Sequence, residues 1–193
     1  MSETLSQTQL KQKKQNRFWA ILAFAGVLIV LALIGIRLIN QDATPVEMGE
    51  SPADFSLTTF EGEVIHSADL RGKVVLINFW ASWCSTCVVE ATLLEQAWQH
   101  YQTGDQSDRV IFLGVAYMDI ENAAGVFLGD HDVTFPNGLD LRGSISRIYQ
   151  VSSVPETFIL DAEGVLRDSK IGPFSSVEEI LTAVDGALSQ PVD

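Results

Sequence analysis

The segment VVLINFWASWCSTC, residues 74–87, contains both cysteines of this 193-residue chain, Cys84 and Cys87. Its first part, 74–80, is a continuous run that is apolar except for Asn78, which is typical of a strand buried on both faces. Apolar residues then recur at intervals of three and four, which predicts a helix from about Ser85 to Gln102. The residues of this stripe are Cys87, Ala91, Leu94, Trp98 and Tyr101. The two cysteines are therefore expected where a buried strand ends and a helix begins.

Further elements are predicted on both sides of this segment. Upstream, alternating apolar and polar residues around Glu61 and Gly62 predict a β-hairpin. Ser175 or Ser176 is expected to cap a final helix. The predicted downstream elements are a buried strand over 109–117, a helix over 121–131, an extended segment over 133–140, a short helix over 144–149, a hairpin turning at 162–164 and the final helix over 175–188. A parallel core that ends in an antiparallel hairpin and is covered by helices is an α/β fold.

The first 39 residues differ in character from the rest of the chain. Residues 18–36 contain no charged side chain, and a helix of this length spans roughly 30 Å, the thickness of the hydrocarbon core of a membrane. The small residues of a cleavage site do not follow, so an uncleaved anchor is favoured over a cleaved signal peptide. The expected organisation is a basic tail over 1–17, a transmembrane signal anchor over 18–39, a linker over 40–50 and a globular domain over 51–193.

Charge is distributed unevenly along the chain. Residues 1–39 contain five basic residues and one acidic residue, so the remainder must carry −17 to give the total net charge of −13. The basic cluster from Lys11 to Arg17 precedes the apolar run, and the positive-inside rule therefore predicts a cytoplasmic N-terminus. The protein is then expected in the inner membrane, with its domain on the periplasmic side. The acidic domain argues against nucleic-acid binding, and it favours a basic partner or simply solubility.

Several kinds of site use a C-x-x-C pair. A zinc site needs four ligands, and His66, His100 and His131 are too scattered to complete one. A copper relay needs a histidine beside the thiols, which the sequence does not place. A structural disulfide with two intervening residues removes little chain entropy. A redox dithiol is therefore favoured, and no metal, haem or flavin cofactor is expected.

The expected position of the dithiol gives each cysteine a role. Cys84 lies at the helix start, where unpaired N–H groups and the helix dipole favour a thiolate, the nucleophile of disulfide exchange. Cys87 lies one turn further along, on the core-facing stripe, within reach of Cys84. We expect Cys84 to attack the substrate and Cys87 to resolve the mixed disulfide.

The segment WASWCSTC, with VPETFILDAEGVL at 154–166, resembles a thioredoxin fold. More narrowly, it resembles the membrane-anchored TlpA, ResA and CcmG (DsbE) group of thiol–disulfide oxidoreductases over about residues 50–188. The resemblance implies a central mixed sheet flanked by helices, an N-terminal β-hairpin and an extra α/β insertion. Asn78 stands where ordinary thioredoxins have a buried aspartate, and asparagine is usual in the membrane-anchored group.

The resemblance also implies roles for single residues. Trp83 matches the tryptophan before the first cysteine, with simple packing as the alternative. Pro155 matches a proline that is cis in these folds and faces the dithiol, and the backbone of Val154 is then expected to pair with an extended substrate. Glu90 matches the glutamate of C-x-x-C-x-x-E that influences thiol ionisation, and Glu156 matches an acidic residue near the active site. The alternative for each glutamate is a solvated surface charge.

Two residues depart from the thioredoxin pattern. Thr86 replaces the proline before the second cysteine, and Thr92 replaces a proline that kinks the active-site helix. Hydroxyl hydrogen bonds from Ser85 and Thr86 would stabilise a thiolate and make the pair more oxidising, whereas a negative Glu90 would raise the thiol pKa. These opposed effects leave the direction of electron flow open.

The resemblance implies a reductant that serves c-type cytochrome maturation by keeping the haem-binding thiols of apocytochrome c reduced. Its electrons would come from an integral-membrane thiol transporter of the CcdA or DsbD type. The alternatives are a disulfide oxidase or isomerase of exported proteins, and a non-catalytic module that binds apocytochrome or an assembly factor. A peroxidase of the peroxiredoxin type is disfavoured, because Ala81 stands where that chemistry wants a threonine.

Overall fold

The computed structural model describes residues 19, 24–32 and 46–190. The chain divides into two compact units, Met1–Ala43 and Thr44–Asp193. Residues 24–32 of the first unit are helical. Among the residues that the structure describes, no helix has both the length and the apolar character needed to cross a membrane. The basic tail and most of the predicted anchor lie outside the described residues, so the anchor stays a prediction.

The second unit contains the predicted strands and helices. Its elements are β1 (Ser56–Thr58), β2 (Val64–His66), the 3-10 helix η1 (Ser67–Leu70), β3 (Val74–Trp80), α2 (Ser85–Thr103), β4 (Val110–Ala116), α3 (Glu121–Asp130), β5 (Asn137–Leu139), α4 (Ser144–Ile148), β6 (Glu156–Leu160), β7 (Leu166–Ile171) and α5 (Val177–Leu188). β1 and β2 form the predicted antiparallel hairpin. Ser176 caps α5, because its side chain accepts a hydrogen bond from the backbone of Glu179. The short helix η1 has no counterpart among the predicted elements.

Five strands form one mixed sheet in the order β5-β4-β3-β6-β7. β3, β4 and β5 are parallel, whereas β6 is antiparallel to both β3 and β7. This confirms the expected parallel core that ends in an antiparallel hairpin. Phe79 of β3 pairs with Glu156 of β6, so the residues just before β6 lie beside the end of β3 that leads to the cysteines.

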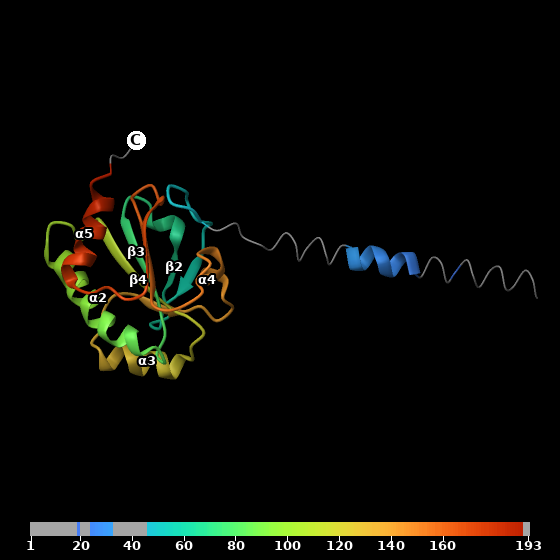
Figure 1. Cartoon of the computed structure of the whole chain (residues 1–193), viewed down its shortest axis with the longest axis horizontal. Helices are drawn as coiled ribbons and strands as arrows, with labels where there is room; N and C mark the ends of the chain where they lie inside the picture. The colour runs from blue at the N-terminus through green and yellow to red at the C-terminus, as the bar shows by residue number, and fades with distance from the viewer. Residues whose placement is uncertain (1–18, 20–23, 33–45, 191–193) are drawn as a thin grey trace, which may run out of the picture. The chain divides into compact units, whose positions relative to one another are not determined.

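The sheet has a packed layer on each face. All of β3 is buried, and its successive side chains point to opposite faces. Leu76 packs in a cluster that includes Leu94 of α2 and Ile180 of α5. Ile77 packs in a second cluster that includes Ile145 of α4 and residues of the β1–β2 hairpin. Figure 1 shows α2 and α5 on one side of the sheet and α4 on the other, which is the thioredoxin-like α/β arrangement.

The predicted linker is described only from residue 46 onward. There the N–H of Gly49 donates to the carbonyl of Leu166 at 2.8 Å, and the N–H of Leu166 donates to the carbonyl of Glu50 at 2.8 Å. Both residues are thus held against the start of β7. The predicted bounds of the linker, 40–50, and of the domain, 51–193, stay a prediction, and these bonds show that residues 49 and 50 contact β7.

Gly114→Ala is expected to destabilise the domain by about 1–3 kcal/mol, because it overpacks a buried site. A Cβ atom at Gly114, on β4, would overlap Asn137 Oδ1. That oxygen accepts a hydrogen bond from Trp80 Nε1 at 2.8 Å, which the substitution would also disrupt. The measurement is the free energy of unfolding in urea.

Gly125→Ala is the matched control for this substitution. Gly125 lies in α3, and a Cβ atom there meets nothing within 4 Å. Alanine in a helix interior is favoured over glycine by about 1 kcal/mol, so this variant should be slightly stabilised. Equal stabilities of the two variants would contradict the overpacking argument.

Candidate active site

A disulfide joins Cys84 and Cys87 at the start of α2. Cys84 is the N-cap residue, and the N–H of Cys87 donates to its sulfur at 3.2 Å. Cys87 is 2% exposed and Cys84 is 7% exposed. The predicted position at a strand-to-helix junction is therefore confirmed, and so is the shielding of Cys87. Negative charge on Cys84 Sγ would be stabilised by the N-terminus of α2.

The segment before β6 faces the dithiol. The carbonyl oxygen of Val154 lies 3.7 Å from Cys84 Sγ. The Val154-Pro155 peptide bond is cis, as the resemblance implied. Pro155 is buried and its carbonyl accepts a hydrogen bond from the N–H of Gly172 at 2.9 Å. The segment that is expected to pair with substrate thus lies against the sulfur that is expected to attack.

The loop after β4 supports the residues before Cys84. Trp83 Nε1 donates to the carbonyl of Met118 at 3.3 Å, and Ser82 Oγ donates to Asp119 Oδ1 at 2.9 Å. Trp83 is 61% exposed and Met118 is 73% exposed, so simple packing does not explain Trp83. Two exposed apolar residues thus lie beside Cys84. Met118 and Asp119 were not predicted.

The two residues between the cysteines differ in their relation to the attacking sulfur. Thr86 Oγ1 lies 3.4 Å from Cys84 Sγ, within hydrogen-bonding reach of sulfur. Ser85 is exposed on the first turn of α2. Of the two hydroxyl groups proposed to adjust the reduction potential, the structure brings that of Thr86 to the sulfur.

Glu90 is buried inside the domain, with 1% of its surface exposed. Its Oε2 accepts a hydrogen bond from Asn78 Nδ2 at 3.0 Å, and its Oε1 accepts one from the N–H of Phe174 at 2.9 Å. Asn78 Nδ2 also donates to Thr157 Oγ1 at 2.9 Å. Burial raises the pKa of Glu90 to about 7, against the opposing effects of these two donors and of Lys170. The alternative of a solvated surface charge is wrong for this residue.

Glu156 is also buried, on β6 directly after Pro155. Its Oε2 accepts no hydrogen bond from any residue that the structure describes. Burial raises the pKa of Glu156, and a backbone hydrogen bond from Ser152 opposes the rise. A solvated surface charge is therefore wrong here too.

Two residues of this hydrogen-bond network, Thr157 and Phe174, were missed because they lie far along the chain from Asn78 and Glu90. Thr157 is 79 residues from Asn78, and Phe174 is 84 residues from Glu90. Only the strand register and the path of the loop after β7 bring them together, and no local sequence pattern encodes either. Asn78 itself was singled out by the resemblance.

Residues 46–190 contain no candidate metal site. No three histidine, cysteine, aspartate or glutamate side chains are grouped there as a metal ion would need. The expectation that the dithiol works without a cofactor stays a prediction.

Known proteins resemble this chain in both sequence and structure. Residues 48–169 match the AhpC/TSA family. The chain is 32% identical over 163 residues to the thioredoxin-like protein YneN of Bacillus subtilis, covering 80% of this chain and 92% of that protein. It is 27% identical over 170 residues to the thiol-disulfide oxidoreductase ResA of Oceanobacillus iheyensis, covering 84% of this chain and 85% of that protein.

Solved structures extend the similarity to the fold. One of them is a secreted disulfide oxidoreductase of Mycobacterium tuberculosis that is described as homologous to DsbE of E. coli. It superposes with a TM-score of 0.60 at 27% identity, covering 68% of this chain and 94% of that one. The similarity therefore spans nearly the whole length of that domain.

Proposed function

The chain belongs to the AhpC/TSA family and is a thiol–disulfide oxidoreductase with a thioredoxin-like fold, and from this premise we propose that it is a membrane-anchored reductase of exported proteins. Its proposed substrate is the disulfide that forms between the haem-binding thiols of apocytochrome c. The main support for the exchange reaction is the position of the Cys84–Cys87 pair at the N-terminus of α2, opposite Val154.

In the first proposed step, the Cys84 thiolate attacks one sulfur of the substrate disulfide. A Cys84–substrate bond forms, the substrate disulfide breaks, and the released substrate sulfur leaves as a thiolate that takes a proton from water. The N–H of Cys87 and the hydroxyl of Thr86 support this step, because both lie close enough to Cys84 Sγ to stabilise its charge. The substrate backbone lies extended along Val154.

In the second step, Cys87 loses its proton and attacks Cys84 Sγ. The Cys84–Cys87 bond forms, the bond between Cys84 and the substrate breaks, and the second substrate sulfur leaves as a thiolate that takes a proton from water. The substrate disulfide thus gains the two electrons that the dithiol loses. Glu90 lies one turn after Cys87 on the same side of α2, and both residues are buried. A buried acid with a pKa of about 7 is suited to accept the proton that Cys87 loses at neutral pH.

The proposed direction of electron flow rests on Glu90. When it is ionised, its negative charge disfavours a thiolate nearby and keeps the pair as thiols. The hydroxyl of Thr86 acts in the opposite direction, and it touches only the outer sulfur. A dithiol whose thiolates are not strongly stabilised is a better electron donor than one whose thiolates are.

The proposed location follows from the sequence of the first 39 residues. We place 18–39 across the inner membrane, the N-terminus in the cytoplasm and the catalytic domain in the periplasm. Electrons then come from a membrane thiol transporter of the CcdA or DsbD type. Carbonate-resistant association of the full-length protein with membranes tests the anchor, and recovery in the soluble fraction would contradict it.

A reduction potential below about −180 mV is expected for the Cys84–Cys87 pair, because the potentials of protein disulfide isomerase and of the DsbA-like oxidants lie at or above that value. The measurement is equilibration of the full-length protein with dithiothreitol buffers, followed by thiol trapping. The reduced protein should also reduce an oxidised C-x-x-C-H peptide, the haem-attachment motif, faster than a peptide of the same composition with a wider cysteine spacing.

Each alternative function gives a different result in these assays. A potential well above about −180 mV, as in the DsbA-like oxidants, would point to an oxidase or isomerase. Peptide binding without exchange would point to a non-catalytic module. Equal rates with both peptides would argue against apocytochrome c as the preferred substrate.

A further inference from the structure

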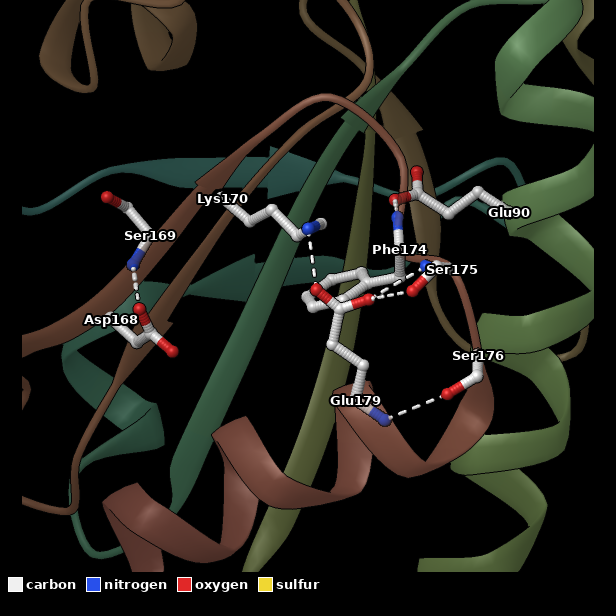
Figure 2. Close-up of polar contacts among 8 residues, drawn as sticks. All are labelled: Glu90, Asp168, Ser169, Lys170, Phe174, Ser175, Ser176 and Glu179. Atoms are coloured by element: carbon white, nitrogen blue, oxygen red, sulfur yellow. Dashed lines mark hydrogen bonds and ion pairs between the residues drawn. The ribbon is translucent and has the colours of Figure 1, made fainter.

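The loop between β7 and α5 contacts the active site at two points. Near its start, the N–H of Gly172 donates to the carbonyl of Pro155 at 2.9 Å. Two residues later, the N–H of Phe174 donates to Glu90 Oε1 at 2.9 Å (Figure 2). One short loop thus joins the proline beside the dithiol to the buried acid on α2.

A charged pair near the surface holds this loop in place. Glu179 Oε2 accepts hydrogen bonds from both the N–H and the hydroxyl of Ser175, at 2.8 and 2.7 Å. Glu179 Oε1 accepts one from Lys170 Nζ at 2.6 Å, and this nitrogen lies 5.4 Å from the centre of the Phe174 ring. Figure 2 shows Lys170 and Ser175 converging on Glu179 while the backbone of Phe174 faces Glu90. Two consecutive N–H groups are therefore fixed by two different carboxylates.

We propose that Lys170 and Glu179 are positioning residues for the redox reaction, which hold the N–H of Phe174 against Glu90 and so adjust the ionisation of the acid behind the dithiol. We name Lys170, Ser175 and Glu179 the β7–α5 clasp. The inference rests on the role of Glu90 in the proposed function. Lys170 and Glu179 are each only about one-third exposed, at 31% and 35%.

The charges around Glu90 agree with this arrangement. Asn78 of β3 donates to Glu90 and also to Thr157 of β6, and neither residue titrates. The charged groups that act on it are Lys170 from β7 and Glu179 from α5, besides the thiol of Cys87 on its own helix in the reduced protein. The Phe174 hydrogen bond and Lys170 both lower the pKa of Glu90, and each outweighs the opposing effect of Glu179. Loss of the clasp should therefore favour the protonated acid.

Lys170→Met is expected to raise the titration midpoint of Glu90 by about one pH unit, because it removes a nearby cation and keeps a side chain of similar length. The measurement is the ¹³C chemical shift of the Glu90 carboxyl group in the oxidised full-length protein, assigned by comparison with Glu90→Gln. The midpoint in the pH profile of disulfide exchange should move in the same direction. Lys170→Arg should restore both midpoints, and Lys73→Met, which removes a lysine outside the clasp, should change neither.

Two substitutions of Glu179 are expected to affect the titration midpoint of Glu90 differently. Glu179→Ala releases Ser175, so the hydrogen bond from Phe174 weakens and the Glu90 midpoint should rise. Glu179→Gln keeps an oxygen for the N–H of Ser175 and removes a negative charge, so the midpoint should stay or fall. Simple destabilisation would not give opposite signs at one position. Glu178→Ala, in the same turn of α5, removes an equal charge outside the clasp and is the matched control.

The proposed role of the clasp is contradicted if Lys170→Met and Glu179→Ala leave the titration midpoint of Glu90 at the wild-type value. If either variant fails to fold, Glu179→Gln decides, because a raised midpoint there contradicts the proposed geometry. The titration is made on the oxidised protein and needs no activity. A wild-type protein that exchanges no disulfides would overturn the proposed function, whereas unchanged midpoints in an active protein would overturn only the clasp.

Discussion

Cys84→Ser should abolish disulfide exchange, with a loss of at least about a thousandfold that brings the rate to the uncatalysed level. The serine hydroxyl cannot form the mixed disulfide, and Cys87 cannot replace the lost thiol because it is 2% exposed. The measurement is the reduction of insulin and of the oxidised C-x-x-C-H peptide by the full-length protein, with dithiothreitol as electron source.

Cys87→Ser is the informative companion to that variant. It keeps the attacking thiol and loses the resolving one, so a covalent adduct between Cys84 and the substrate should accumulate and be released by added reductant. Ser85→Ala changes an exposed residue between the cysteines and should retain most of the exchange activity. A Cys84→Ser protein with more than a tenth of wild-type activity, or adducts on Cys87 in place of Cys84, would contradict the assigned roles.

The fold was predictable because its central elements have strong local patterns. The apolar run at 74–80 has no polar residue except Asn78, and such a run is stable only when both faces of the strand are covered. The stripe on α2 and the cap at Ser176 likewise identify helices from neighbouring residues alone. Short irregular contacts carry no such pattern. The backbone hydrogen bonds that Gly49 and Glu50 make with Leu166 are an example.

In the active site, too, only the part that depends on local sequence patterns was predictable. The spacing of Cys84, Cys87 and Glu90 on one helix can be read directly from the sequence. The hydrogen bond from the N–H of Phe174 to Glu90 joins residues 84 positions apart, so it follows only from the tertiary fold. Thr86 is an intermediate case. Its hydroxyl was named from the sequence, and only the cap geometry of Cys84 brings it to 3.4 Å from the sulfur.

The stability of the oxidised protein should fall as the pH rises from about 5 to 8, and Glu90→Gln should remove most of that fall. In the unfolded chain the acid titrates near its ordinary pKa of 4.5, whereas burial raises the pKa of folded Glu90 to about 7. Below the lower value both states hold the proton, so the stabilising contribution is complete. It is lost as the pH passes through 7, and the difference of about 2.5 units corresponds to about 3 kcal/mol.

Glutamine is a fair substitute for Glu90 because the surroundings can adapt to it. The amide oxygen of the introduced glutamine can accept the N–H of Phe174, as Glu90 Oε1 does. The new amide nitrogen would then face Asn78 Nδ2, and a flip of Asn78 would turn its oxygen toward that nitrogen and toward the hydroxyl of Thr157. The introduced amide and the hydroxyl of Thr157 thus keep partners, so the variant should fold.

The decisive measurement is the free energy of unfolding of both oxidised proteins in urea at about pH 5 and about pH 8. The wild-type value minus the variant value should decrease by about 2.5 kcal/mol between these conditions, because part of the full effect lies below pH 5. Glu156 also has a raised pKa, but it contributes equally to both proteins and cancels in the difference. Glu61→Gln, at the exposed hairpin turn, controls for the loss of one negative charge and should follow the wild-type pH dependence. Parallel curves for wild type and Glu90→Gln would mean that Glu90 is ionised in the folded protein throughout this range, and its proposed role as proton acceptor for Cys87 would then fail.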